Sequence, residues 1–472
     1  MIRKITKIFT ITLASLVVSI SAWLWWGSSL DADFIDRHEL IEVAKQIQPI
    51  ENAFTDLAYL AGNNGIEVIE ANDIQLINSI YDGKWDKDQA LILTEKYGED
   101  LDVLRSASLK PYFKTPPLDN DNFINYSGLT SINKLAVIQS RLFMEVNDPE
   151  SATKWALTSL RYSKLLKSDL SPSLIAYMIG IYSQHISNNW VHRLVSNYML
   201  SDSQLKSLAN QLNISNDFPN DGFPEVYSGE FDYSISVTNA QLQIGFSERW
   251  STIFSEQYSE FDQHWLLKIL HLIAPNYFFH RNTSTSNHAI GLRKLQVAAQ
   301  KGCSYSTNEP SNTEVNQNSA NDSWLLQLRP NAIGIEIFGA ESDPPALSSY
   351  GDYLHRRCFN VAYFQAVRAI VAIKRFQLVT NNEPNDLSQL SPEYLPSLPV
   401  DPLLLPNDTQ PLRFNADKRW LYSFGMNRQD GGGSANSTYQ YRCYKDNVSG
   451  LECQNNPTFP IDIGLDATLM VF

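Results

Sequence analysis

The chain begins with positively charged residues, and an uncharged, mostly apolar run follows them. Arg3, Lys4 and Lys7 precede residues 8–26, a run without any charged residue. A helix of this length can cross the roughly 30 Å hydrocarbon core of a bilayer, and positive charge on its N-terminal flank keeps that end in the cytoplasm. The pattern predicts a transmembrane signal anchor within residues 1–30, single-pass in the inner membrane of a bacterial envelope, with the bulk of the chain in the periplasm.

A cleaved signal peptide is the alternative reading of the same segment. Ser19 and Ser21, just before Ala22, form a small-x-small site after a short apolar region, the arrangement found at signal peptidase sites. The tryptophans that end the run favour the uncleaved anchor, because indole rings prefer the membrane interface.

Residues 31–303 follow a helical period, and three helix starts combine a capping residue with proline or glutamine at the expected spacing. They are Asp148 with Pro149, Ser171 with Pro172 for a helix through about Ser196, and Ser201 with Gln204. The helix after Pro149 has one face suited to close packing, and an apolar face just upstream predicts its antiparallel partner. The first face carries Ala152, Trp155, Ala156, Ser159, Tyr162, Ser163 and Leu166, and the second Ile132, Leu135, Ile138 and Leu142. We therefore expect an irregular α-helical domain built of packed hairpins.

The pattern changes after residue 303. Residues 304–323 are rich in Ser and Asn, which predicts a loop or linker. A long helix is expected from Tyr350 to Leu378, mostly buried, with a narrow polar stripe of Gln365, Arg368 and Arg375. Proline-rich turns and short extended runs follow, at residues 412–414 and 420–424. Residues 324–472 thus predict a long helix packed on a small antiparallel sheet, and the fold class of the whole chain is α+β, mainly α.

The length of the chain indicates its number of domains, and its net charge argues against one class of partner. A chain of 472 residues suggests two or three domains. Its formal net charge of −14 and the lack of a basic patch argue against nucleic acid as a partner, because such binding depends on clustered lysine and arginine.

The four cysteines avoid the C-x-x-C spacing of zinc and thioredoxin-like sites. Their even number fits disulfides in an oxidising compartment. Cys443 and Cys453 can close a hairpin, which leaves Cys303 for Cys358, one of the three possible pairings.

Several short segments of the C-terminal region, in this order, carry a family resemblance. They are Ala366 to Ile370, Arg375 and Phe376, Glu383 to Leu387, Tyr394 and Leu395, Val400 to Pro402, Leu421 to Gly425, and Asp462 to Gly464. This region resembles the globular domain of the type II secretion major pseudopilin, and resembles more closely a group of uncharacterised bacterial envelope proteins that join such an ending to a helical region. The match covers roughly the last 120 residues.

The chain also departs from the pseudopilin pattern. A pseudopilin carries its transmembrane segment at the start of the helix that packs on the sheet, after a prepilin-peptidase site. Here the corresponding helix begins far downstream of the anchor, and no such site precedes the anchor. The resemblance therefore implies a borrowed module and not a subunit that polymerises by the usual route.

The resemblance also implies calcium as a cofactor. Major pseudopilins bind Ca²⁺ around segments that correspond here to Asp430, Asp462 and Asp466. Calcium requires six to eight oxygen ligands, and only one carboxylate stands in the segment at Asp430. A plain turn stabilised by Asp430 and a disulfide is the alternative.

No residue set predicts a reaction. His185 with His192, and His264 with His271, are seven residues apart, which is not the H-E-x-x-H spacing of a zinc site. We expect these histidines to be packed or on the surface. Glu230 and Asp232 could form the carboxylate pair of a glycan hydrolase, but a solvated or hydrogen-bonded acid is the better interpretation. No G-x-S-x-G, P-loop or G-x-G-x-x-G motif is present.

The leading hypothesis is a membrane-anchored periplasmic scaffold or partner-binding protein, without catalysis, that has an envelope protein partner and is associated with secretion or type IV pilus-like machinery. The alternatives are a hydrolase of an envelope glycan with Glu230 among its acids, and a periplasmic ligand-binding protein. The tryptophans at 190, 250, 265 and 324 fit core packing, or an aromatic groove under the last alternative.

Overall fold

The protein is mainly helical, with a small antiparallel sheet. The computed structural model describes residues 2–31, 47–62, 68–116, 124–168, 173–216, 223, 225–231, 277, 279–300, 346–403, 410–416, 420–423 and 463–465. The chain divides into two compact units. Unit 1 comprises Met1–Glu42, Tyr227–Gln296 and Pro310–Gly351, and unit 2 comprises Val43–Val226, Val297–Glu309 and Asp352–Phe472.

Most of the described helices belong to unit 2. Unit 1 contains α1 (Ile2–Ser28) and most of α14 (Arg281–Gln300). Unit 2 contains α2 (Ala53–Leu57), α3 (Ala71–Tyr81), α4 (Lys87–Lys96), α5 (Gly98–Ala107), α6 (Tyr126–Glu145), α7 (Pro149–Lys167), α8 (Leu174–Asn197), α9 (Asp202–Ile214) and most of α16 (Ala346–Thr380). Short 3-10 helices lie at Pro49–Glu51, Ala58–Ala61 and Leu387–Leu390, and the strands are β1 (Arg413–Asn415), β2 (Trp420–Ser423) and β3 (Ile463–Leu465).

Within unit 1, the end of α1 is fixed to the start of α14. The carboxylate of Asp31 accepts hydrogen bonds from the backbone N–H groups of Asn282 (3.3 Å) and Thr283 (2.9 Å). These donors belong to the first turn of α14, where backbone N–H groups have no partner inside the helix. The ring of Trp23 packs on that of Tyr277 with centroids 4.6 Å apart. The residues that follow α1 therefore attach it directly to folded structure.

The predicted N-terminal helix is present as α1. The structure describes the side chains of α1 only at Thr12 and from Ala14 onward. Among the residues that the structure describes, which leave out most side chains of α1 before Ala14, no helix is long and apolar enough to cross a bilayer.

The capping residues explain where the unit 2 helices begin. Asp148 accepts a hydrogen bond from the backbone N–H of Ser151 and starts α7, and Ser201 forms the predicted capping box with Gln204 at the start of α9. The start of α8 differs from the prediction, because Ser173 is its N-cap and accepts from the N–H of Ala176. The cap is thus a serine two positions after the predicted Ser171, and its hydroxyl is bonded to the first turn of α8.

Helices α6 and α7 pack as the predicted antiparallel pair, and α8 packs against both of them. Ser159 on α7 donates to the Oδ1 atom of Asn133 on α6 (2.8 Å) and lies 2.7 Å from the hydroxyl of Ser187 on α8. All three side chains are buried, so the bonds between them satisfy polar groups that water cannot reach. The small hydroxyl side chains let three helix backbones approach one another.

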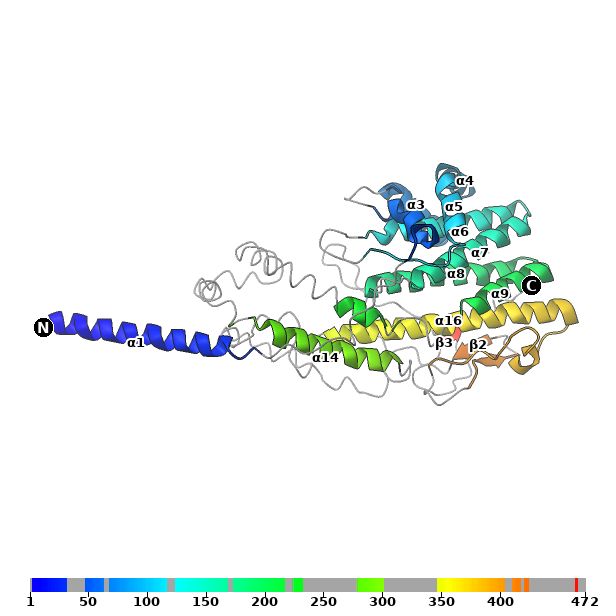
Figure 1. Cartoon of the computed structure of the whole chain (residues 1–472). Helices are drawn as coiled ribbons and strands as arrows, with labels where there is room; N and C mark the ends of the chain where they lie inside the picture. The colour runs from blue at the N-terminus through cyan, green and yellow to red at the C-terminus, as the bar shows by residue number, and fades with distance from the viewer. Residues whose placement is uncertain are drawn as a thin grey trace. The chain divides into compact units, whose positions relative to one another are not determined.

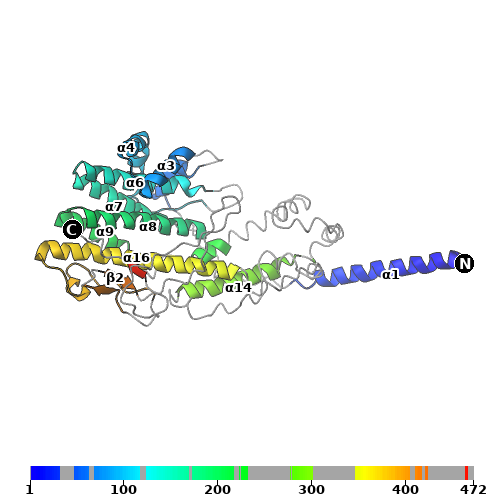
Figure 2. The ribbon, with the colours of Figure 1, turned by 180° about the vertical axis from the view of Figure 1, so that it is seen from behind.

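Helix α16 lies in the middle of unit 2. Figures 1 and 2 show it running beside α9 on one side and the sheet on the other. Residues 364–373 are all buried, almost three helical turns without an exposed position. One hydrophobic core joins residues of α6–α9, α16 and the strands β1 and β2. A helix that is buried all round has packing partners on every side.

The predicted polar stripe of α16 faces α9. Gln365 donates to Asn216 (2.8 Å), the Nη2 atom of Arg368 donates to Asn213 (2.9 Å), and Arg375 pairs with Asp202 (3.1 Å). Burial lowers the pKa of Arg368 to about 10, which keeps its guanidinium charged at neutral pH. These bonds fix the register between two helices far apart in the sequence.

The sheet has the order β1-β2-β3, and both pairings are antiparallel. Two segments of the family resemblance meet beside it: both carboxylate oxygens of Asp401 lie 2.8 Å from the hydroxyl of Ser423, at the end of β2. The predicted small antiparallel sheet is present, and Leu421 of β2 belongs to the same core as residues of α16.

The domain boundaries at 303/304 and 323/324 lie outside the described residues and stay predictions. The described parts on either side of them nevertheless share one core. Helical body and C-terminal helix thus form a single packed structure within unit 2.

Candidate functional site

The residues predicted to bind calcium, Asp430, Asp462 and Asp466, lie outside the described residues, so calcium stays a prediction. In the part of the chain that the structure describes, no group of three or more His, Cys, Asp or Glu residues could hold a metal ion. Glu230 is half-buried in the described segment 225–231, whereas Asp232 lies outside it, and their pairing is likewise untested.

Cys358 on α16 is buried and takes part in a disulfide. The other three cysteines, Cys303, Cys443 and Cys453, lie outside the described residues. The pairing of Cys303 with Cys358 therefore stays a prediction.

His185 and His192, one face of α8, pack against a single tyrosine of α16. The ring centroids of His185 and Tyr363 are 5.2 Å apart, and those of His192 and Tyr363 are 6.4 Å apart. Burial lowers the pKa of His185. The expectation that these histidines pack is confirmed; His264 and His271 lie outside the described residues.

The partly buried imidazole of His185 makes the stability of the protein depend on pH. Because the pKa of His185 is lower in the folded than in the unfolded chain, the unfolded chain binds more protons as pH falls below about 6.5. The free energy of unfolding should therefore decrease on acidification from pH 7 to 5, and decrease less in His185→Gln. Urea unfolding at both pH values measures this; equal losses in the variant and the parent protein would contradict it.

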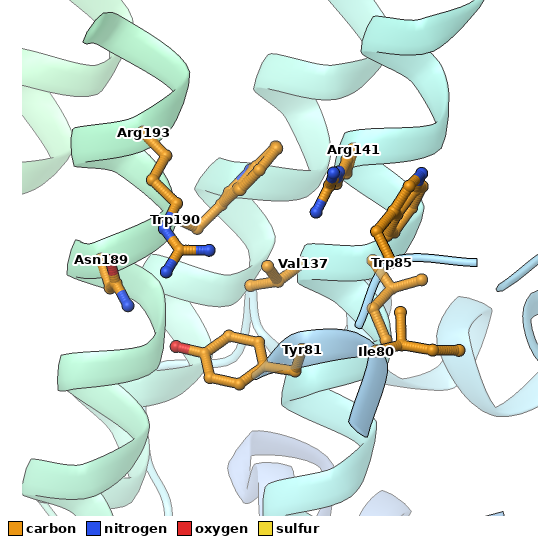
Figure 3. Close-up of a pocket in the computed structure, with 9 residues that line it drawn as sticks. Ile80, Tyr81, Trp85, Val137, Arg141, Asn189, Trp190 and Arg193 are labelled. Carbon is orange, nitrogen blue, oxygen red and sulfur yellow. The ribbon is translucent and has the colours of Figure 1, made fainter. Parts of the chain in front are cut away.

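The described residues also form a feature that the sequence did not predict, a small hollow of about 20 Å³ between α3, α6 and α8. Figure 3 shows its side chains converging from these helices and from the loop before α4. Helices α6 and α8 contribute residues at the same spacing, i, i+1 and i+4, which places them on one helix face. The lining consists of Ile80, Tyr81, Trp85, Val137, Ile138, Arg141, Asn189, Trp190 and Arg193.

Arg141 stacks on an aromatic wall of the hollow. Its guanidinium carbon lies 3.8 Å from the ring centroid of Trp85, a close cation–π contact. Burial lowers the pKa of Arg141, and the positive charge of Arg193 lowers it further. Glu145, one turn along α6, opposes this shift, but it lies 4.0 Å from Lys87 and makes no ion pair with Arg141.

Arg193, on α8, is exposed at the rim of the same hollow. Its positive charge also opposes the rise in the pKa of Tyr81, which burial brings to about 12. The phenol therefore stays neutral and keeps its proton. In Figure 3 the Tyr81 hydroxyl points toward Asn189, whose side chain interacts with the phenol and also opposes the rise in its pKa.

Trp190 forms part of the hollow and of the core. It is buried, and its indole N–H donates to the hydroxyl of Ser140 (2.7 Å). Core packing, expected for this tryptophan from the sequence, is thus confirmed, and its polar atom is already bonded. Trp190 offers the hollow an apolar surface.

A comparison with protein-family models, with curated proteins and with solved structures finds no match to this chain. A function for this protein has to be inferred from its own residues and their geometry.

Proposed function

We propose that this protein is a single-pass protein of the inner membrane, anchored by α1, whose periplasmic body is a non-enzymatic scaffold that binds an envelope protein partner. The observation that carries the proposal is the burial of residues 364–373 of α16 on all sides. A helix enclosed in this way has no free face with which to enter a helical filament. The pseudopilin-like region is then an integral part of the scaffold.

The pattern of charge and exposure supports the anchor. Three positive residues precede the uncharged run 8–26, and the described apolar side chains in α1 are widely exposed, for example Val18 at 66% and Trp25 at 76%. A helix that exposes apolar side chains along its length requires lipid or another apolar surface to cover it. Association with secretion or type IV pilus-like machinery rests on the family resemblance.

The anchor predicts that a charge in the middle of the run prevents membrane insertion. Val17→Arg should greatly reduce the fraction of the protein that resists alkaline carbonate extraction, since arginine at the centre of a membrane helix opposes insertion. Ser29→Arg, beyond α1, is the matched control and should leave that fraction unchanged. Equal extraction of the two variants would contradict the anchor.

Cross-linking of the full-length protein in intact cells tests partner binding. A discrete cross-linked species containing one envelope protein, absent when the cells are lysed and diluted before cross-linking, is the expected result. Recovery of only the monomer under both conditions would overturn the proposed function.

A further inference from the structure

We propose that the outer face of α4 is the docking site for the envelope protein partner, and that the docked segment carries apolar residues flanked by lysine or arginine. The inference rests on the proposed function and gives its partner a chemistry and a place on the protein. The outer face consists of Asp88, Leu91, Ile92 and Glu95. Their spacing, i, i+3, i+4 and i+7, sets the four side chains on one side of the helix.

The middle of this face is apolar and open to solvent. Leu91 is 39% exposed and Ile92 is 63% exposed. The packing of α4 on the rest of unit 2 uses a different side of the helix, where Ala90 and Leu93 are buried in the core. Figures 1 and 2 show α4 at the outer edge of unit 2, on the side opposite the sheet. Helix α4 therefore has a second apolar surface, at the spacing with which helices bind a partner.

Carboxylates bracket the apolar pair. Asp88 lies one turn before it and Glu95 one turn after it, and both are exposed. Within the part of the chain that the structure describes, neither carboxylate pairs with a basic side chain. Asp73, in the neighbouring helix α3, provides the contrast, because it pairs with Lys96 at 2.7 Å. Two carboxylates on the outer face of α4 are thus available to basic groups of another molecule.

Charge selects the occupant of the face. A second copy of this chain would bring carboxylates against carboxylates, in a protein whose net charge is already −14. The same carboxylates would repel an anionic lipid surface. A protein segment with basic residues on both sides of an apolar pair would neutralise Asp88 and Glu95 and cover Leu91 and Ile92 together. That segment is the occupant we infer.

Photo-cross-linking of the full-length protein in intact cells tests the site. Photoreactive benzoylphenylalanine replaces Ile92, and in the matched control it replaces Ile214 at the end of α9, which is also 63% exposed. Position 92 should capture the partner roughly tenfold more efficiently than position 214, because a cross-link forms only where the partner docks. Mass spectrometry should place the link among apolar residues of the partner that have lysine or arginine within about one helical turn on both sides.

The identity of the cross-linked molecule separates the possible occupants. A link from position 92 to a second copy of this chain, to lipid, or to a partner segment without basic residues would overturn the inference. Equal capture from positions 92 and 214 would overturn it as well.

Charge variants test the role of the carboxylates. With the photoreactive residue at position 92, Asp88→Lys and Glu95→Lys should each lower capture by roughly tenfold, since each replaces an attraction by a repulsion. Glu51→Lys, also at an exposed position, makes the same change in net charge and is the matched control. Glu95 lies in the last turn of α4, where a basic side chain favours the helix, so Glu95→Lys keeps the test valid even if Asp88→Lys unfolds α4. Unchanged capture in Glu95→Lys would refute the docking face.

A general cross-linker applied to the parent protein distinguishes the two proposals. An envelope protein captured by the general cross-linker, but not from position 92, would refute the docking face and leave the proposed function standing. No partner captured by either method would refute the proposed function itself.

Discussion

Replacing Ile370 by alanine is expected to lower the free energy of unfolding by about 2–5 kcal/mol, the range for deleting a large buried aliphatic side chain. Ile370 is 2% exposed and belongs to the core shared by α6–α9, α16 and the sheet. The helical body and the C-terminal region should therefore lose stability together. Urea unfolding followed by tryptophan fluorescence and by far-UV circular dichroism should give coincident transitions, both at lower urea.

Val379→Ala, on the same helix, is the matched control. Val379 is 53% exposed, so its replacement should change the free energy of unfolding by less than about 0.5 kcal/mol. Two separate transitions, of which only one shifts in Ile370→Ala, would show that the C-terminal region folds as an independent domain and would contradict the shared core.

Gly180→Ala on α8 should also be destabilising. A Cβ atom at this position would lie 2.5 Å from the backbone nitrogen of Lys167 and 2.9 Å from the carbonyl carbon of Leu166, both on α7. These are backbone atoms, so relief requires the helices to move apart. Overpacking costs about 1–3 kcal/mol, and the better helix propensity of alanine offsets only about 1 kcal/mol of it.

Gly98→Ala on α5 is the control for the same chemical change. No atom lies within 4 Å of the position that its Cβ would occupy, so alanine should stabilise the protein by about 0.4–1 kcal/mol. Thermal unfolding of the two variants should therefore shift in opposite directions. A stabilised Gly180→Ala variant would show that α7 and α8 are not in close contact.

Local signals in the sequence predicted most of the helices that the structure describes. A capping residue acts within one turn of its helix, so Asp148 and the Ser201–Gln204 pair could be identified without any tertiary information. The face of α7 from Ala152 to Leu166 followed from the helical period alone. The long helix was predicted to begin at Tyr350, whereas α16 begins at Ala346.

Tertiary relationships were harder to predict. The polar stripe of α16 was recognised, but its partners Asn213 and Asp202 belong to α9, which precedes it by more than a hundred residues. The hollow was missed for the same reason. Trp85, Arg141 and Arg193 come from three segments, and only the packing of α6 against α8 reveals that the two arginines share a space.

The central position of α16 also determines when this protein can finish folding. Arg368 and Asn213 are 155 positions apart in sequence, and Asn360 and Gln184, which are also hydrogen-bonded, are 176 apart. A chain made from its N-terminus presents α6–α9 long before α16 exists, so the surface that α16 later covers is apolar and open during synthesis. Such long-range closure is slow and leaves intermediates prone to aggregation. Each newly made molecule therefore stays incompletely folded until α16 has been synthesised. A chain released before that point would leave the apolar surface of α6–α9 exposed.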